Sequence, residues 1–419
     1  MYSLQNKTNI VDILEERLPP DLVGCIRKAG ETAAERGEQL YLVGGAVRDM
    51  LLGRGTLDID LVVEGNAISL AETLAGQLGG KVTAHSRFGT ATLKRDNKSI
   101  DFVTARSEVY QKPGALPQVQ PGSITDDLAR RDFSINAMAV ALHPERSGEL
   151  IDLYGGIEDL RNNFIRVLHE KSFTDDATRI WRAVRYEQRL GFAIEPMTLL
   201  LLERDLPMLA TISGDRIRHE LEHVLRETEP EHALRRAAHL GLLERLNPAL
   251  IFNDDLAARF DTARHRYGDN LSPAIYLSLL FCQLPVADLD ETIKYLHLTS
   301  AEQETIRQAA SIQDRIEELA TPGLSPSRVY EILQAFQPSA LIAASLCADS
   351  VVSEQVELYL NVLRHVKTAL SGESLKNMGI AEGPAIKKIL TALREAKLNG
   401  TVANKSEEVA LVNSLLEMN

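Results

Sequence analysis

Residues 41–63 read YLVGGAVRDMLLGRGTLDIDLVV and carry the signals that decide the fold of the first third of the chain. A β-branched run leads directly into Gly44 and Gly45, which predicts a strand that enters a tight turn. The segment Ala46–Leu52 then predicts a short helix. A glycine pair lets backbone amides approach a phosphate closely, and Arg48 in the first helical turn would add a formal positive charge. A bare strand–helix turn without a ligand is the alternative.

The next strand, predicted over Leu57–Val63, holds two carboxylates in an otherwise apolar run. Residues i and i+2 of a strand project from the same face, so Asp58 and Asp60 would lie side by side. Two neighbouring anions are costly in a half-buried strand unless a cation neutralises them. Oxygen ligands favour Mg²⁺. Asp101, in the predicted strand Ser99–Thr104, offers a third acid for which a metal role and a solvent-facing role are equally open.

Beyond this region, strand signals end near residue 155 and apolar residues at helical spacing continue to the C-terminus. We therefore predict an α+β protein, with an N-terminal head of mixed β-sheet and helices followed by an all-helical neck, body and tail. The expected boundaries are 1–145 for the head, 146–230 for the neck, 231–324 for the body and 325–419 for the tail.

The amino-acid composition limits the kinds of partner that the protein can bind. The 419 residues include 46 Lys and Arg against 59 Asp and Glu, a net charge of −13, which argues against coating nucleic acid by bulk electrostatics. No apolar stretch approaches the roughly 20 residues that cross a bilayer, and the N-terminus lacks a signal-peptide pattern. Three widely spaced cysteines predict reduced thiols rather than disulfides or a zinc cluster. We expect a cytoplasmic protein without a membrane partner.

Three polar residues further along share a helical spacing. Asp176, Arg179 and Arg182 are spaced i, i+3, i+6, which predicts one stripe of a helix over Asp176–Arg189. A carboxylate acceptor beside a forked guanidinium donor can read the Watson–Crick edge of a base. Cytosine and adenine both present an amino group beside a ring acceptor, whereas uracil and guanine present a carbonyl there. An ordinary intrahelical ion pair is the alternative.

These motifs together carry a resemblance. GGAVRD (44–49) followed by the D-I-D of the next strand resembles the first motif of nucleotidyltransferases related to polymerase β, in the branch of bacterial tRNA CCA-adding enzymes and poly(A) polymerases. The resemblance continues in order through RRDFSINAMA (130–139), LIDLYGGIEDLR (150–161) and DDATRIWRAVRY (175–186). The last of these is similar to the nucleotide-selecting E-D-x-x-R helix, with Asp175 where the family has Glu, which leaves the role of that acid open.

The resemblance implies a role for each motif. In the family, an Arg and an Asp contact the incoming nucleotide and favour ribose, a role that falls here on Arg131 and Asp132 and that we extend to Asn136. Paired guanidiniums suit phosphate oxygens. The apolar run Phe133–Leu142 predicts a helix. The expected catalytic acids are Asp58, Asp60 and Asp101, with Asp58 and Asp60 holding Mg²⁺, and the expected nucleotide-binding residues are Gly44, Gly45, Arg48, Arg131, Asp132, Asn136, Asp176, Arg179 and Arg182.

Positive charge gathers in the expected neck. Between Arg161 and Arg189, seven Lys and Arg face four acids, a local charge of +3 in an acidic chain. This segment predicts a path for an RNA backbone, with Arg161, Arg185 and Arg189 as candidate contacts. By the resemblance, the tail is expected to bind tRNA as well.

The expected activity is template-independent addition of C and/or A, from CTP and ATP, to the 3′ end of tRNA by metal-assisted attack of the 3′-hydroxyl on the α-phosphate. A CC-adding or A-adding specialist remains an alternative, distinguished in the family by a loop that falls within Glu108–Ser123. A bacterial poly(A) polymerase usually adds a basic C-terminal extension, which is lacking here. A non-catalytic RNA-binding protein is expected to have lost Asp58 or Asp60. Neither GxxxxGK[ST] nor GxGxxG occurs, which excludes P-loop and dinucleotide-binding enzymes.

Overall fold

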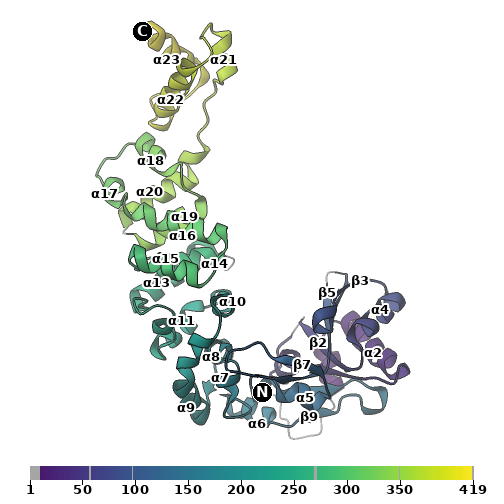
Figure 1. The fold of residues 1–419 in the computed structure, drawn as a ribbon. Coiled ribbons are helices and arrows are strands. Elements are labelled where there is room, and N and C mark those ends of the chain that lie inside the picture. The colour runs from purple at the N-terminus through teal and green to yellow at the C-terminus, as the bar shows by residue number, and fades with distance from the viewer. Residues whose placement is uncertain (1–9, 56–57, 97, 269–270, 349, 418–419) are drawn as a thin grey trace. The chain divides into compact units, whose positions relative to one another are not determined.

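The structure, a computed structural model, describes residues 10–55, 58–96, 98–268, 271–348 and 350–417 (Figure 1). The chain forms two compact units. The first holds the residues up to Glu220 together with Leu240–Arg245, and the second holds Leu221–His239 and the chain from Leu246 onward. The break falls inside the expected neck, and the finer division into neck, body and tail stays a prediction.

A seven-stranded mixed sheet, ordered β3-β4-β5-β2-β1-β8-β9, forms the centre of the first unit. Strands β2 and β5 run parallel, and the other neighbouring pairs are antiparallel. The strands are β1 (Gln39–Val43), β2 (Ile59–Glu64), β3 (Lys81–His85), β4 (Thr90–Arg95), β5 (Lys98–Thr104), β8 (Met138–Ala141) and β9 (Leu150–Asp152). Leu57, the expected start of β2, lies outside the described residues.

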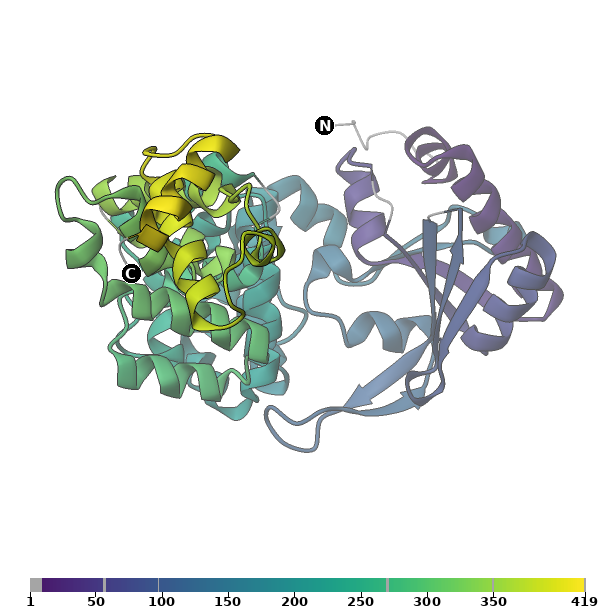
Figure 2. The same ribbon diagram turned by 90° about the horizontal axis from the view of Figure 1, so that it is seen from above.

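Helices cover both faces of this sheet. Helices α2 (Pro20–Glu35) and α4 (Ala67–Leu78) pack on one face, where Figure 1 and Figure 2 show them in purple. On the other face, α5 (Ile124–Ala129) packs against Tyr41 and Val62 of the sheet. The α+β prediction for the head is therefore confirmed.

The helix expected over Phe133–Leu142 is wrong. A short 3₁₀ turn, η2 (Ser134–Asn136), leads into β8, whose four residues are all buried between β1 and β9. A short, continuous apolar run fits a strand buried on both faces as well as it fits a helix, so periodicity could not separate the two.

The loop expected within Glu108–Ser123 is the tip of a two-stranded hairpin, whose strands the sequence did not predict. Strands β6 (Arg106–Val109) and β7 (Gln118–Pro121) pair antiparallel from Arg106 with Pro121 to Val109 with Gln118. Three prolines in the segment had suggested only an extended loop.

The rest of the first unit is mainly helical, with one short pair of parallel strands. These elements are α1 (Ile10–Arg17), α3 (Gly45–Leu51), η1 (Ser86–Phe88), η3 (Pro144–Arg146), α6 (Gly156–Asn162), β10 (Phe164–Ile165), α7 (Ser172–Asp175), α8 (Thr178–Leu190), β11 (Ala193–Ile194), α9 (Pro196–Asp205), η4 (Leu206–Thr211), α10 (Gly214–Leu225) and α12 (Leu242–Leu246). The last residues of α10 and α12 belong to the second unit.

The second unit is helical throughout its described residues, as predicted. Its elements are α11 (Pro230–His239), α13 (Asp254–Tyr267), α14 (Pro273–Phe281), α15 (Val286–Tyr295), α16 (Ser300–Gln313), α17 (Ile316–Leu319), α18 (Pro326–Leu333), α19 (Pro338–Cys347), α20 (Ser350–Asn361), η5 (Leu363–His365), α21 (Gly372–Asn377), α22 (Pro384–Leu398) and α23 (Lys405–Glu417).

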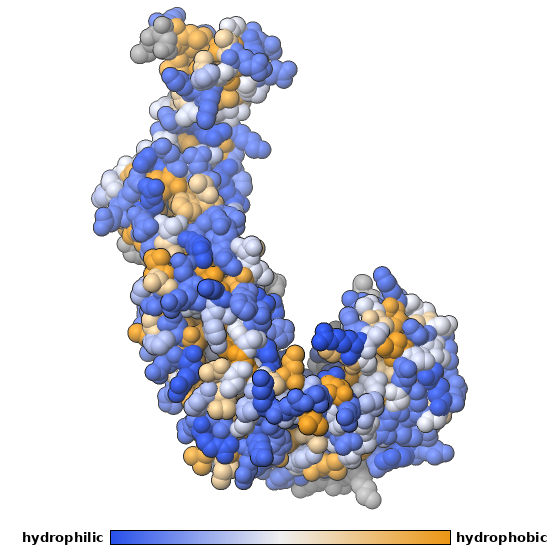
Figure 3. Space-filling view, in the orientation of Figure 1, coloured by the Kyte–Doolittle hydropathy of each residue, from blue (hydrophilic) through white to orange (hydrophobic). Residues whose placement is uncertain are grey.

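Helices α21 to α23 surround an apolar core of their own, with Leu375, Leu393 and Val412 at its centre. The fully buried carboxylate of Glu408 accepts hydrogen bonds from the backbone amide of Leu370 and from Lys397 Nζ, which fixes α23 to the preceding chain. Hydrophilic side chains cover most of the surface seen in Figure 3, with smaller apolar patches between them. Within the described residues, every helix is too short or too polar to span a membrane.

Candidate active site

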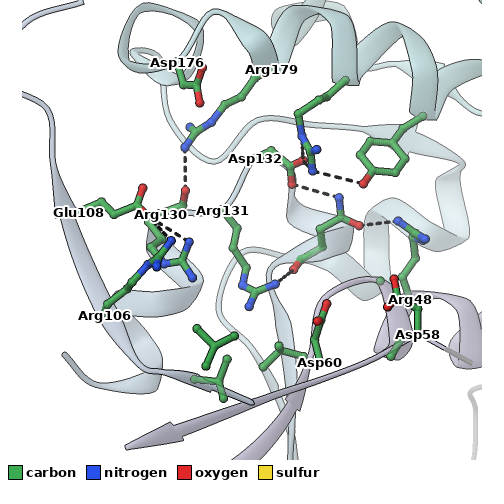
Figure 4. Close-up of a pocket in the computed structure, with 18 of the residues that line it drawn as sticks. Arg48, Asp58, Asp60, Arg106, Glu108, Arg130, Arg131, Asp132, Asp176 and Arg179 are labelled. Carbon is green, nitrogen blue, oxygen red and sulfur yellow. Dashed lines mark hydrogen bonds and ion pairs between the residues drawn. The ribbon is translucent and has the colours of Figure 1, made fainter. Parts of the chain in front are cut away.

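A cavity of about 630 Å³ in the first unit collects most of the predicted site residues. Figure 4 shows them converging from the sheet on one side and from α8 on the other. Gly44 and Asp101 lie next to its lining residues in the chain or in the sheet, whereas Arg161 and Arg185 do not line it. The predicted residues that line the cavity are Gly45, Arg48, Asp58, Asp60, Arg131, Asp132, Asn136, Asp176, Arg179, Arg182 and Arg189.

Three carboxylates gather at the sheet. Asp60 of β2 and Asp101 of β5 are register partners on parallel strands, and Asp58 directly precedes β2. One oxygen from each lies within 4.8 Å of the others. Burial and the neighbouring charge of Asp58 raise the pKa of Asp60 to about 6. An all-oxygen donor set whose own repulsion disfavours ionisation fits a divalent cation, so the three residues can hold one.

The Arg131 guanidinium lies close to the backbone of the glycine turn at Gly44. Gly44 has φ of +68°, and a Cβ built there would lie 2.6 Å from Arg131 Nη1. A side chain at Gly44 would therefore strain the backbone and displace the Arg131 guanidinium. Arg131 Nη1 in turn donates to the carbonyl oxygen of Asn136 at 3.3 Å, which joins the turn to the RRD segment.

Asp127 was not among the predicted site residues, although it orients two arginines. Its carboxylate is fully buried, and Oδ1 pairs with Arg130 Nη2 at 2.5 Å while Oδ2 pairs with Arg131 Nη2 at 2.8 Å. The i, i+3 and i, i+4 spacing on α5 is a signal that could have identified it. The paired guanidiniums thus share one acid within the protein, which fixes their planes.

A hydrogen-bond network joins Asp132 to two further arginines (Figure 4). Asp132 Oδ2 pairs with Arg182 Nη2 at 2.7 Å, and Oδ1 accepts from Asn136 Nδ2 at 3.0 Å. Asn136 Oδ1 accepts from Arg48 Nη1 at 2.7 Å. Burial alone would raise the pKa of Asp132, but the charge of Arg182 and the bonds from Asn136 and Arg182 lower it to about 2. This carboxylate is therefore ionised and oriented before any substrate binds.

Tyr186, which the sequence did not single out, lies at the centre of this network. The guanidinium carbons of Arg48, Arg182 and Arg185 lie 5.2, 5.5 and 4.8 Å from its ring centroid. Such distances are favourable for cation–π attraction, so one ring helps to hold three arginines. Its place at the end of the motif DDATRIWRAVRY, four residues after Arg182 on α8, is a signal that could have identified it.

The three predicted RNA contacts differ in exposure. Arg185 is only 6% exposed, with its guanidinium against the Tyr186 ring. Arg161 lies on α6, with Nη1 3.6 Å from a Glu158 carboxylate oxygen. Arg189 is exposed and lines the cavity. Of the three, only Arg189 is among the residues that line the cavity, and the RNA-binding roles of all three stay predictions.

The predicted stripe of Asp176, Arg179 and Arg182 on one helix is wrong in part. Helix α8 begins at Thr178, so Asp176 lies in extended backbone before it and accepts a bond from the Thr178 amide at 3.0 Å. Its side chain forms a local turn with Thr178 instead of lying along the helix, because short acids bond readily to backbone amides two residues further on. Asp176 and Arg179 still line one cavity.

Arg179 is buried, and its guanidinium bonds to neutral groups. Its guanidinium donates to Ser172 Oγ and to the carbonyl oxygen of Arg130, both at 2.7 Å, and the residue is 5% exposed. Asp175, the last residue of α7, does not line the cavity. Trp181 is 1% exposed, as expected for core packing.

The β6–β7 hairpin forms part of the cavity wall. Glu108 accepts from Arg106 Nη2 at 3.1 Å, from Arg130 Nη1 at 3.2 Å and from the Tyr110 hydroxyl at 2.9 Å. Burial and the charge of Glu108 raise the pKa of Tyr110 well above its ordinary value, so its hydroxyl remains a donor. The segment that sequence reasoning left as a loop thus contributes charged groups to the site.

Comparison with known proteins identifies the family. The description "Poly A polymerase head domain" matches residues 40–166, and "Probable RNA and SrmB- binding site of polymerase A" matches residues 191–252. The A-adding tRNA nucleotidyltransferase of Halalkalibacterium halodurans is 35% identical over 95% of this chain and 94% of its own length. The chain belongs to the tRNA nucleotidyltransferase family. The predicted resemblance is therefore confirmed.

Two further relatives show how far the tRNA nucleotidyltransferase likeness extends. The A-adding tRNA nucleotidyltransferase of Geobacter sulfurreducens is also 35% identical over 98% of this chain, which spans about half (49%) of that relative. A solved apo form of a CCA-adding enzyme matches with a TM-score of 0.83 at 31% identity, covering 97% of this chain and 99% of the other. The likeness thus includes the helical second unit as well as the head.

Proposed function

We propose that this enzyme transfers nucleotides from CTP and ATP to the 3′ end of tRNA. The observation that carries the proposal is one cavity that combines an acidic, cation-fitting corner with an oriented carboxylate and arginines around it. The name shared by the relatives supplies the tRNA substrate.

In this proposal the residues of the chain bind and orient the two reactants. Arg131, with its plane fixed by Asp127, is placed to contact the triphosphate from the side of the acids. Asp132, held ionised by Arg182, accepts a hydrogen bond from a ribose hydroxyl. The 3′-hydroxyl oxygen attacks the α-phosphorus in line, the bond to pyrophosphate breaks, and positioning and charge neutralisation supply most of the acceleration. Gly44, Gly45 and Arg48 complete the proposed nucleotide contacts.

Asp58, Asp60 and Asp101 would hold the catalytic cation, with Mg²⁺ as the ion that an all-carboxylate set and phosphate ligands favour. When bound, such an ion neutralises the triphosphate and lowers the pKa of the attacking hydroxyl. The hydrogen bond from Thr92 Oγ1 to Asp101 Oδ1, at 2.5 Å, fixes the orientation of the third acid.

The three cysteines are free thiols, which supports the expected cytoplasmic location.

Base choice is assigned to Asp176 as acceptor and Arg179 as donor, which together match the amino group and ring nitrogen shared by cytosine and adenine. Two relatives at 35% identity are A-adding enzymes, so we infer that AMP is one of the nucleotides transferred.

The deciding experiment incubates the protein with Mg²⁺ and tRNAs that end before CCA, after C, and after CC, each with labelled CTP or ATP. We expect a single A on the tRNA ending in CC. Addition of C to the shorter substrates would identify a CCA-adding or CC-adding enzyme. Long A tracts on a tRNA or on an unrelated RNA would favour the poly(A) polymerase alternative, and no incorporation on any substrate would overturn the proposal.

A further inference from the structure

The Asp176 carboxylate is held from one side. All three hydrogen bonds that the structure gives it fall on Oδ1, from the Thr178 amide at 3.0 Å, from Thr178 Oγ1 at 2.7 Å and from Arg216 Nη2 at 2.7 Å. This arrangement leaves Oδ2 to accept from a group inside the cavity, which Asp176 lines.

Arg216 has a second contact, with the hairpin. Its Nη1 donates to the carbonyl oxygen of Gly114, between β6 and β7, at 3.4 Å. Gly114 has φ of +71°, and a Cβ at this position would overlap Thr211 at the end of η4. The hairpin tip therefore lies close to the chain just before α10, and one guanidinium joins it to Asp176.

We infer that Arg216 is a positioning residue that sets the acceptor geometry of Asp176, and that discrimination among the four bases depends on it. The inference rests on the proposed function, because it assigns base reading to Asp176. Arg216 lies forty residues from Asp176 in the sequence and outside the four motifs. Without the guanidinium, only Thr178 would restrain the carboxylate, which could then rotate and no longer present a fixed acceptor to the base.

The test compares Arg216→Ala, Arg216→Lys and the wild type, with kcat and KM measured for each of the four nucleoside triphosphates on a tRNA ending in CC. We expect Arg216→Ala to reduce the ratio of kcat/KM for ATP to that for GTP by on the order of tenfold, mainly through KM. Arg216→Lys keeps a charge beside Asp176 and should recover part of this ratio. Arg226→Ala removes an exposed arginine paired with Glu222 and should leave the ratio unchanged.

Two results would overturn the inference. Unchanged base ratios in Arg216→Ala, with normal ATP incorporation, would show that Asp176 is set without it. An equal loss with all four triphosphates, accompanied by a lower melting temperature, would indicate a structural role only. If Arg216→Ala fails to fold, Arg216→Gln takes its place in the same comparison, and the same two results would overturn the inference. Failure of the wild type to add any nucleotide would instead reject the proposed function.

Discussion

The acids of the cavity form two groups that differ in their partners. Asp60 lies beside two other carboxylates, and burial and repulsion raise its pKa to about 6. Asp132 is more deeply buried, yet Arg182 and Asn136 lower its pKa to about 2. In the first group the carboxylates repel one another, and a bound cation would bring the compensating positive charge. In the second group Arg182 already supplies that charge. The same residue type thus serves to receive a cation in one corner and to present a fixed acceptor in the other.

The largest effect should come from removing an acid of the first group. Asp58→Ala or Asp60→Ala should reduce nucleotide incorporation to background, because no neighbouring residue can replace a lost cation ligand. The measurement is incorporation of labelled ATP into tRNA ending in CC, with folding checked by circular dichroism. Glu203→Ala, at an exposed acid on α9, is the matched control and should retain activity. Robust incorporation by either aspartate variant would contradict the proposal that these acids hold the catalytic cation.

Asp132→Asn tests the second group and should have the next largest effect. It leaves the Arg182 charge without its main partner, and breaking an enclosed pair costs about 3 kcal/mol of unfolding free energy. The folded pKa of about 2 lies below the ordinary 3.8, so the stabilisation is fully present above pH 3.8 and is lost as the pH falls toward 2.

Thermal melts of wild type and Asp132→Asn should therefore differ at pH 7 and converge in acid. Asp254→Asn is the control, because that carboxylate is 97% exposed beside Arg235 and should contribute little. Equal melting temperatures for Asp132→Asn and wild type at pH 7 would show that the two groups of acids do not differ as described.

The opposite sign is expected for Asp60→Asn. A folded pKa of about 6 against an ordinary 3.8 means that the charge destabilises the cation-free fold, with a penalty that grows from pH 3.8 and is complete above pH 6. At pH 8 in the presence of a chelator, removing the charge should increase the free energy of unfolding by about 2 kcal/mol and so raise the melting temperature. At pH 4 the substitution should change the melting temperature little. Added Mg²⁺ should stabilise the wild type and not the variant. A lower melting temperature for Asp60→Asn at pH 8 would contradict the repulsion.

The sequence predicted the first group better than the second, for a physical reason. Asp58 and Asp60 stand two residues apart beside a glycine turn, so local spacing alone brings them to one face. The partners of the second group are distant in the chain, since Arg182 reaches Asp132 across fifty residues. Local patterns cannot show which distant residues meet, and here only the resemblance brought them together.

Three features escaped prediction for related reasons. β8 was taken for a helix because burial on both faces removes the alternation that marks a strand. The spacing of Asp176 fits α8, although the residue precedes the helix and its side chain bonds to Thr178. Asp127 lies outside the quoted motifs, and Tyr186 ends one of them, and both act on the arginines around the cavity.

The smallest effect should come from Tyr186, which supports the second group only through its ring. Tyr186→Phe keeps the face that Arg48, Arg182 and Arg185 share and loses hydroxyl contacts such as the 3.3 Å bond from Arg182 Nη2, so it should have a small effect. Tyr186→Leu removes the ring and should cost about 1 kcal/mol and raise the KM for ATP a few-fold, because the arginines lose a common restraint.

Steady-state kinetics and thermal melts of both variants distinguish the contribution of the Tyr186 ring from that of its hydroxyl. Tyr330→Leu is the matched control, since Tyr330 lies 5.6 Å from the Arg394 guanidinium in the second unit and should affect stability without changing the KM for ATP. If Tyr186→Phe were as damaging as Tyr186→Leu, the hydroxyl would be the restraint on Arg182. The second group would then depend on hydrogen bonds alone. It would differ from the acids at the sheet in its hydrogen-bonding partners, and not in positive charge held over an aromatic face.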